Sequence, residues 1–228
     1  MIALFSLILT ICLYWGAKWC YKRKPKVYLS PLLTVPVLVV GGLFLTHTSY
    51  EAYDTGAHWL SRMLEPATIA FAVPLYKYFN ILKKHAAEII LSVLSGSVTA
   101  IISSMAMAKM LHLNTEIVDS LIPRSVTTPI AMGVSESIGG VPAITAVFVI
   151  MTGLLGSVIG PMIIQLLRIE NDIARGVLLG TAAHGAGTSK AFEFGSVTGT
   201  ISSLSMIMAA LITLFLTPWI LPVMLIFF

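Results

Sequence analysis

The segment Leu121–Gly140 combines polar and helix-breaking residues, although long apolar runs flank it on both sides. It contains Arg124 and Glu136, and its two prolines, Pro123 and Pro129, each remove a backbone donor. Each proline also moves the preceding residue out of the α region. Freed backbone groups and charged side chains are tolerated at membrane depth only where protein or a water-filled cavity satisfies them. We therefore expect a broken helix that lines a polar site, with the other helices built around it.

The apolar content of the chain predicts a membrane protein. Of its 228 residues, 57% are hydrophobic and 11% are charged, and the mean hydropathy is +0.93. A soluble domain cannot bury that much apolar surface, so we expect an all-α polytopic membrane protein. The net charge of +4 comes mostly from short basic loops such as residues 21–26, and it does not indicate a nucleic-acid partner. Since no catalytic, nucleotide-binding or metal-binding motif occurs, we expect no enzyme activity, cofactor or metal.

The hydrophobic runs predict a single transmembrane domain over residues 1–228 with seven or eight hydrophobic segments. Lys24, Lys84 and Arg168 are expected in the cytoplasm, because Lys and Arg in short loops set orientation, so the N-terminus lies outside. The first span is not expected to be a cleaved signal. Two further segments, 117–137 and 173–194, either cross the membrane or re-enter it. The expected crossing helices cover residues 2–20, 28–46, 59–79, 86–111, 141–167 and 198–219, with an acidic outer loop over 49–58.

An internal comparison favours re-entrant hairpins. A shift of 57 positions aligns Thr127-Thr128 with His184-Gly185 and Glu136 with Glu193. Downstream, residues 144–163 share six identities with the shifted sequence, against roughly two expected by chance at this composition. We therefore predict two units, 117–167 and 174–222, each a hairpin followed by one span, after the N-terminal spans of residues 1–112. Inverted repeats with broken segments that meet at mid-membrane are typical of secondary transporters.

Several polar residues of the first broken segment are candidates for ligand binding. Arg124 offers a planar fork suited to a carboxylate, although it can equally serve as the structural counter-ion of Glu136. Thr127 and Thr128 either contact the ligand or satisfy the backbone freed by Pro129. Ser125 lies between these residues and completes the predicted anion site.

The second candidate segment is broken by glycines around His184. His184 has the one side chain of the proposed site that titrates near neutral pH, which predicts a substrate or proton role, although a packed histidine is the alternative. The remaining candidates fall into three sets. They are Gly185 and Thr188 for substrate binding; Pro66, Pro74 and Gly187 for helix breaks; and Glu65, which caps a half-helix or takes part in coupling, with Lys190 and Glu193, which pair on one helix face.

Three co-linear motifs give the chain a family resemblance. Residues 64–76 read LEPATIAFAVPLY, residues 123–133 read PRSVTTPIAMG and residues 180–185 read GTAAHG. These motifs resemble the LrgB/CidB family, and the resemblance covers nearly the whole chain. The family was first described as holin/antiholin-like modulators of murein hydrolase activity and autolysis. Its members are usually paired with a small LrgA/CidA-like membrane protein.

The resemblance also implies transport of small carboxylates. A plastid relative carries glycolate and glycerate, and bacterial pairs take part in pyruvate transport. The LrgA-like half of the plastid form is absent from this chain. We therefore expect a carrier for a small 2-oxo or 2-hydroxy monocarboxylate in a bacterial cell membrane, as a homo-oligomer such as a dimer. The alternative function is a holin/antiholin-like modulator of autolysis with no specific substrate. The site residues rest on the analysis of the sequence alone.

Overall fold

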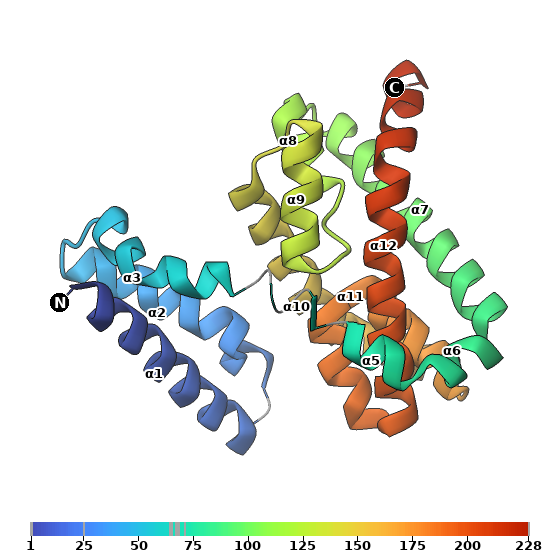
Figure 1. Cartoon of the computed structure of the whole chain (residues 1–228), viewed down its shortest axis with the longest axis horizontal. Helices are drawn as coiled ribbons and strands as arrows, with labels where there is room; N and C mark the ends of the chain where they lie inside the picture. The colour runs from blue at the N-terminus through green and yellow to red at the C-terminus, as the bar shows by residue number, and fades with distance from the viewer. Residues whose placement is uncertain (1, 25, 64–65, 67–68, 71, 228) are drawn as a thin grey trace. The chain divides into compact units, whose positions relative to one another are not determined.

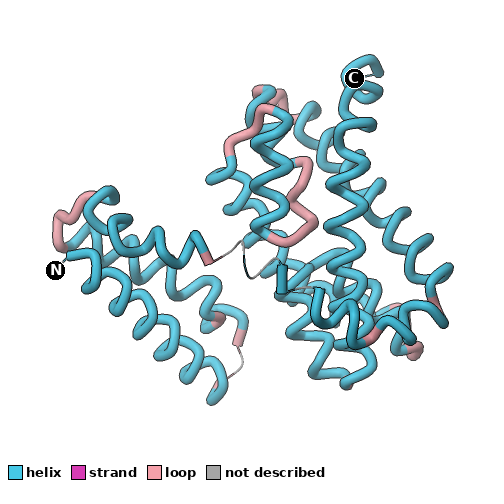
Figure 2. The backbone as a smooth tube through the Cα atoms, in the orientation of Figure 1, coloured by secondary structure: helices cyan, strands magenta, loops and turns pink. Residues whose placement is uncertain are grey.

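The computed structural model describes residues 2–24, 26–63, 66, 69–70 and 72–227. Every regular element in this part of the chain is helical (Figure 1, Figure 2). The prediction of an all-α protein is therefore confirmed. Backbone packing divides the chain into two units, Met1–Ile69 and Ala70–Phe228. That these units form one transmembrane domain stays a prediction.

Four helices in the described part of the chain are long and apolar enough to cross a membrane. They cover Leu4–Arg23, Ala86–Met110, Pro142–Leu166 and Ser196–Trp219, close to four of the predicted spans. A shorter apolar helix, Pro31–Leu45, stands where the second span was predicted. The chain is therefore a membrane protein by composition and by the length of its helices.

The first unit contains α1 (Ile2–Arg23), the 3-10 helix η1 (Val27–Leu29), α2 (Pro31–Leu45) and α3 (Tyr50–Arg62). Helix α1 packs against α2 and α3, and the hydroxyls of Thr10 and Tyr53 share a hydrogen bond of 2.8 Å. The prediction of an outer loop over residues 49–58 is wrong, because α3 occupies this stretch. Ser49 Oγ accepts a hydrogen bond of 3.2 Å from Ala52 N, and such a side-chain cap stabilises the start of a helix.

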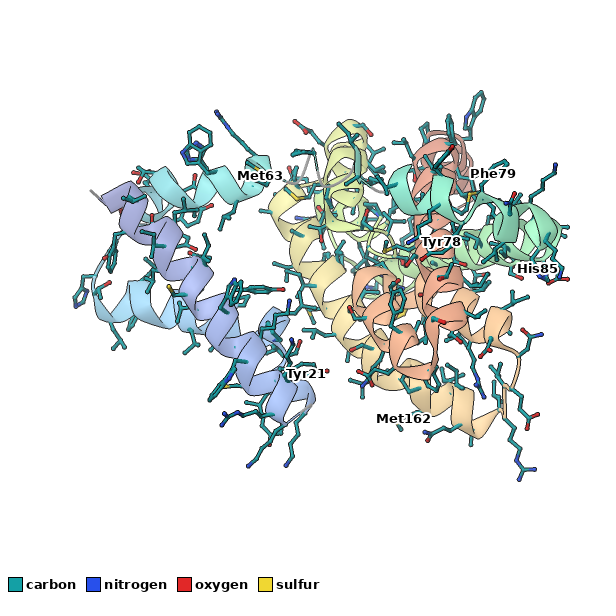
Figure 3. The ribbon with its side chains drawn as sticks, turned by 60° about the horizontal axis from the view of Figure 1, so that its bottom comes forward. Tyr21, Met63, Tyr78, Phe79, His85 and Met162 are labelled. Atoms are coloured by element: carbon teal, nitrogen blue, oxygen red, sulfur yellow. The ribbon has the colours of Figure 1, made fainter. Side chains whose placement is uncertain are left out.

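Two short helices follow one another in the C-terminal part of the span predicted over 59–79. Among the described residues of this stretch, α3 ends at Arg62, and α5 (Ala72–Lys77) is separated from α6 (Phe79–Lys84) by Tyr78. Aromatic and basic side chains gather here, among them Tyr78, Phe79 and His85 (Figure 3). Such a mixture suits a membrane surface better than its hydrocarbon centre, which is the physical reason for the break at Tyr78.

The rest of the second unit contains the helices that form the candidate site. They are α7 (Ala86–Met110), α8 (Thr115–Leu121), α9 (Thr128–Ile138), α10 (Pro142–Leu166), α11 (Asp172–Phe194) and α12 (Ser196–Phe227).

The segment from α8 to α9 forms a hairpin, which we call the first hairpin, and we call its non-helical residues 122–127, which run beside α9 (Figure 2), its tip. The end of α9 returns to the level of the end of α8, since Val141 N donates a hydrogen bond of 2.7 Å to Ser120 Oγ. The approach is so close that a Cβ on Gly140 would lie 2.7 Å from Ser120 N. Of the two topologies that the sequence left open for this segment, the structure has the hairpin.

Helix α11 is bent back on itself, and we call it the second hairpin. His184 has φ 37° and ψ −123°, so the helix is interrupted there and divides into the arms 172–183 and 185–194. The far ends meet: the Arg175 guanidinium carbon lies 5.6 Å from the centroid of the Phe194 ring. In a straight helix these residues would be about 28 Å apart. This segment therefore also folds as a hairpin, with His184 at its tip.

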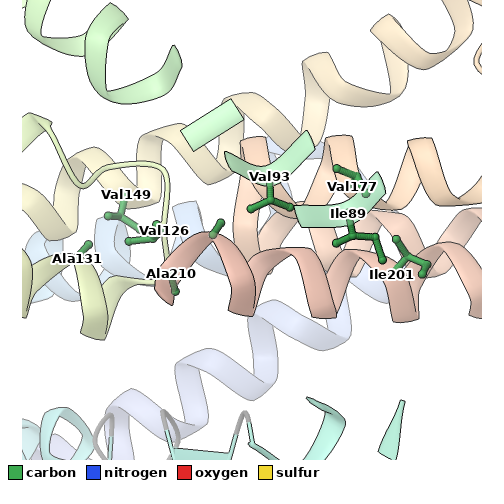
Figure 4. Packing of buried hydrophobic residues seen from close by; sticks show 9 residues of the cluster. Ile89, Val93, Val126, Ala131, Val149, Val177, Ile201 and Ala210 are labelled. Atoms are coloured by element: carbon green, nitrogen blue, oxygen red, sulfur yellow. The ribbon is translucent and has the colours of Figure 1, made fainter. Parts of the chain in front are cut away.

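Both tips meet α10 at Val149. Val126 of the first tip belongs to one buried apolar cluster with Val149, Ala131 and Ala210 (Figure 4). His184 of the second tip is hydrogen-bonded to the Val149 carbonyl. The bases of the two hairpins lie at opposite ends of α10, so the hairpins enter from opposite sides. The 57-residue shift aligns residues that stand at the two tips, as the predicted repeat requires.

This arrangement predicts the membrane sides of three exposed positions. In a chain whose two native cysteines are replaced by serine, Lys84→Cys and Arg168→Cys are expected to react with an impermeant thiol reagent only from the cytoplasm. Glu116→Cys is expected to react only from outside, because α7 and α10 each separate it from the other two positions. Labelling of intact cells and of inverted vesicles measures this. Labelling of all three from one side would contradict the hairpin topology.

Candidate functional site

Arg124 lies in the first tip and points toward α7. Its Nε donates a hydrogen bond of 2.8 Å to Ser104 Oγ, and the arginine is only partly buried. Glu136 is exposed, and no salt bridge within 4.0 Å joins it to Arg124. The alternative in which Glu136 is the structural counter-ion of Arg124 is therefore wrong in this structure. Ser104 engages only the Nε–H group, so the four N–H groups on Nη1 and Nη2 stay available for an anion.

Thr127 and Thr128 begin the second arm of the first hairpin. Thr127 is the N-cap residue of α9, and its side chain makes no capping hydrogen bond. The residue is 6% exposed, and its Oγ1 has no hydrogen-bond partner in the described part of the chain. A buried hydroxyl without a partner costs free energy, and contact of this hydroxyl with the ligand stays a prediction. Ser125 lies in the turn and is half-buried.

Pro123 and Pro129 break the segment in a different way from a kinked helix. Residues 122–127 leave the helix altogether, and α9 then starts at Thr128 with Pro129 in its first turn. Proline is favourable there, because the N–H groups of a first turn have no intrahelical partner. Pro129 therefore starts a helix rather than breaking one.

His184 forms the second tip in a strained backbone conformation that non-glycine residues rarely adopt. Its side chain is 7% exposed, and Nε2 donates a hydrogen bond of 3.1 Å to the Val149 carbonyl. This partner selects the tautomer with the proton on Nε2. A second proton would give the buried ring a positive charge, and no carboxylate of the described residues lies beside it to compensate that charge. The geometry therefore favours a neutral ring that holds the tip in place.

The other candidates of the second hairpin have separate roles. Gly185 is exposed and starts its second arm. Gly187 lies against the Leu179 carbonyl of the first arm, so its missing side chain permits the fold-back. Thr188 Oγ1 is 3.0 Å from Ser202 Oγ of α12, and the two hydroxyls share a hydrogen bond. Thr188 therefore joins α11 to α12 in this structure, and substrate binding by its hydroxyl stays a prediction.

The candidates for ion pairing and for the first motif lie elsewhere. Lys190 Nζ and Glu193 Oε2 are 2.7 Å apart, so the predicted pair is formed on one helix face. Because both side chains are partly exposed, such a pair contributes little to stability. Glu65 lies outside the described residues. Pro66 is exposed, and Pro74 stands inside α5, with its side chain outside the described part.

The starts of two half-helices meet near Val149. The second arm of the first hairpin starts at Thr128, and that of the second hairpin starts at Gly185. The N-terminus of a helix carries a partial positive charge and free N–H groups, so it attracts an anion. With Arg124 beside the first tip, this part of the molecule is suited to a small anion. The described residues contain no group of three His, Cys, Asp or Glu side chains that could hold a metal ion.

Sequence reasoning missed three residues of this region: Ser104, Thr181 and Ser205. Ser104 orients Arg124, and the hydroxyls of Thr181 and Ser205 are buried without a hydrogen-bond partner among the described residues. Their helices are rich in small residues, which also allow close helix packing. No local pattern distinguishes such a hydroxyl from a packing residue, because the difference depends on what faces it.

Comparison with known proteins identifies the family. The family model described as the LrgB-like family matches residues 10–223. The chain belongs to the LrgB-like family. The resemblance seen in the sequence is thus confirmed, and no solved structure matches this LrgB-like chain.

Several curated relatives cover nearly the whole LrgB-like chain. It is 63% identical to uncharacterized protein YwbG of Bacillus subtilis (strain 168) over 98% of this chain and 99% of the relative. It is 38% identical to uncharacterized protein YxaC of the same strain, over 95% and 94%. It is 34% identical to antiholin-like protein LrgB of Bacillus cereus (strain B4264), over 96% and 95%. These names support an antiholin-like function better than monocarboxylate transport, for which they identify no substrate.

Proposed function

We propose that this LrgB-like chain is a carrier that moves a small monocarboxylate across a bacterial cell membrane. The observation that supports it most is the meeting of two hairpin tips at Val149, each of which starts a half-helix. Paired half-helices entering from opposite sides are the usual construction of a substrate site in secondary transporters. A pore without a specific substrate requires no such construction.

The chemistry of the tips favours a carboxylate. Arg124 supplies a charged fork, and Thr127 supplies a buried hydroxyl without a partner. Arginine binds planar carboxylates through two parallel hydrogen bonds, and a hydroxyl donor suits the oxygen of a 2-oxo or 2-hydroxy group. Pyruvate, glycolate and glycerate have this combination and are small enough to lie between two helix ends.

A second candidate function is an antiholin-like modulator of autolysis. It is favoured by the name of the relative from Bacillus cereus, which is 34% identical over nearly the whole chain. In that function the hairpins would be structural, and a small LrgA/CidA-like membrane protein would be the partner that the chain regulates. Our proposal also includes that partner and a homodimer, with the N-terminus outside.

A flux assay separates the two functions. The purified chain is reconstituted into proteoliposomes, alone and with an LrgA/CidA-like protein, and uptake of labelled pyruvate, glycolate and glycerate is measured. We expect saturable uptake of at least one acid that the unlabelled acid competes away, without leakage of a trapped neutral sugar. Equal release of the sugar would support a pore instead. No saturable uptake in either preparation would contradict the carrier.

A further inference from the structure

The first arm of the second hairpin ends at His184, which leaves the helical conformation. The last carbonyl groups of a helix generally lack a partner within that helix. The end of a helix carries a partial negative charge. In transporters with broken helices, such ends and unwound carbonyls coordinate a cation.

Two buried hydroxyls without partners lie at this same level. Thr181 stands three residues before the tip, and its Oγ1 has no hydrogen-bond partner among the described residues. Ser205 of α12 is 0% exposed, and its Oγ also has none. Nearly all buried hydroxyls in proteins are hydrogen-bonded. Two hydroxyls without a partner beside a helix end therefore indicate a ligand that binds to hydroxyl oxygen atoms.

Both hydroxyls belong to residues within one helical turn of the same contact between α11 and α12. Gly180 of α11 lies against the backbone of Ser202 in α12, with a Cβ position 3.0 Å from Ser202 Cα. Thr181 follows this contact by one residue and Ser205 by three, or less than one helical turn. Ser205 is also flanked, one turn away on each side, by Ile201 and Ala209, two members of the buried cluster around the tips.

This place is separate from the arginine. Both places contact helix α7, and their separation along this helix can be measured. A Cβ on Gly96 would lie 2.9 Å from Thr181 Cγ2, whereas Ser104 is hydrogen-bonded to Arg124. Eight residues of helix separate these two contacts, which corresponds to about 12 Å. The 57-residue shift aligns Thr181 with Arg124. The first hairpin thus has the charged side chain of Arg124 at the aligned position, and the second hairpin has the neutral hydroxyl of Thr181.

We propose that Thr181 Oγ1, Ser205 Oγ and the end carbonyls of the first arm bind a sodium ion that couples to the transported anion. Hydroxyl and carbonyl oxygens are hard ligands, and the absence of a carboxylate among these ligands favours a monovalent over a divalent cation. Sodium binding at one tip strengthens carboxylate binding at the other, because two opposite charges about 12 Å apart attract across a medium of low dielectric constant. This inference rests on the proposed carrier function and names its coupling ion.

The test measures sodium binding to the purified full-length chain without a substrate. Equilibrium binding of labelled sodium and thermal unfolding are followed as NaCl replaces choline chloride at constant ionic strength. A ligand that binds only the folded protein raises the unfolding temperature. We expect saturable binding and a rise in unfolding temperature with sodium that potassium and choline do not reproduce.

Matched variants locate the site. Thr181→Val and Ser205→Ala each remove one hydroxyl with little change of volume, and each is expected to weaken sodium binding about tenfold, the size typical of groups that support a bound ion. Thr181→Ser keeps the hydroxyl and should retain binding. Ser203→Ala is the control, because Ser203 Oγ already donates to the Gly199 carbonyl on the same helix.

The outcomes distinguish this inference from the carrier function. Sodium binding that is absent, or equal in the parent, Thr181→Val and Ser205→Ala, would overturn the sodium site. If carboxylate flux then persists without sodium, the carrier function stands while the sodium site fails. If the two variants lose sodium binding while the parent shows no carboxylate flux at all, the result would support the sodium site and contradict the carrier function.

Discussion

Replacement of Arg124 by alanine is expected to reduce carboxylate uptake in proteoliposomes about a hundredfold, while the protein still folds. The loss of a partly buried charged partner costs a few kcal/mol, and each 1.4 kcal/mol corresponds to a factor of about ten. Arg124→Lys keeps the charge but loses the fork, so an intermediate reduction of about tenfold is expected. Initial rates at equal protein incorporation measure both effects.

The control for Arg124 is Arg168→Ala. Arg168 is exposed at the end of α10, so its removal should leave uptake unchanged. The double variant Arg124→Gln with Glu136→Gln tests the structural alternative directly. Since no salt bridge joins these residues in the structure, we expect no recovery of uptake. Full recovery of uptake in the double variant would contradict the assignment of Arg124 to the substrate site.

Gly180→Ala is expected to destabilise the protein by about 2 kcal/mol and to lower its unfolding temperature in detergent. A Cβ at this position would lie 3.0 Å from both the carbonyl carbon and Cα of Ser202, with the carbonyl oxygen closer still. The obstacle is the backbone of another helix, so α11 and α12 must separate, and overpacking of this kind costs about 1–3 kcal/mol. The higher helix propensity of alanine offsets part of this cost.

Gly133→Ala is the matched control for the packing argument. Gly133 lies on the exposed side of α9, and a Cβ there would meet nothing within 4 Å. Alanine should therefore stabilise α9 by about 0.5–1 kcal/mol through its lower conformational entropy in the unfolded chain. Equal unfolding temperatures for Gly180→Ala and the parent would show that α11 and α12 do not pack as closely as described.

The sequence was sufficient to locate the breaks in the fold. Prolines before and after Arg124, and glycines around His184, disfavour an uninterrupted helix by local sterics, and the structure leaves the helical conformation at residues 122–127 and at His184. The apolar runs likewise predicted the long helices, because a span of lipid requires a minimum length of apolar helix. The shift of 57 residues aligns Thr127 in the first tip with His184 in the second, and the two repeat units stay a prediction.

Local patterns failed where the neighbours of a segment decided its structure. The acidic composition of residues 49–58 predicts a loop, yet residues 50–58 form most of α3, because Ser49 caps this helix and α1 packs against it. Glu136 was a candidate partner for Arg124 by charge, but the guanidinium meets Ser104, twenty residues earlier in the chain. Complementary charge alone does not specify which residues the fold brings together.

The sequence by itself determined that the chain is helical, enters a membrane, breaks twice and belongs to the LrgB-like family. The first three properties depend on backbone sterics and on total apolar content, both of which are local or additive along the chain. Only the tertiary structure decided that the broken segments return as hairpins, that both tips meet at Val149, and that the hydroxyls of Thr127, Thr181 and Ser205 are buried without partners among the described residues. A hydroxyl becomes a site only through what surrounds it, and its surroundings come from distant parts of the chain.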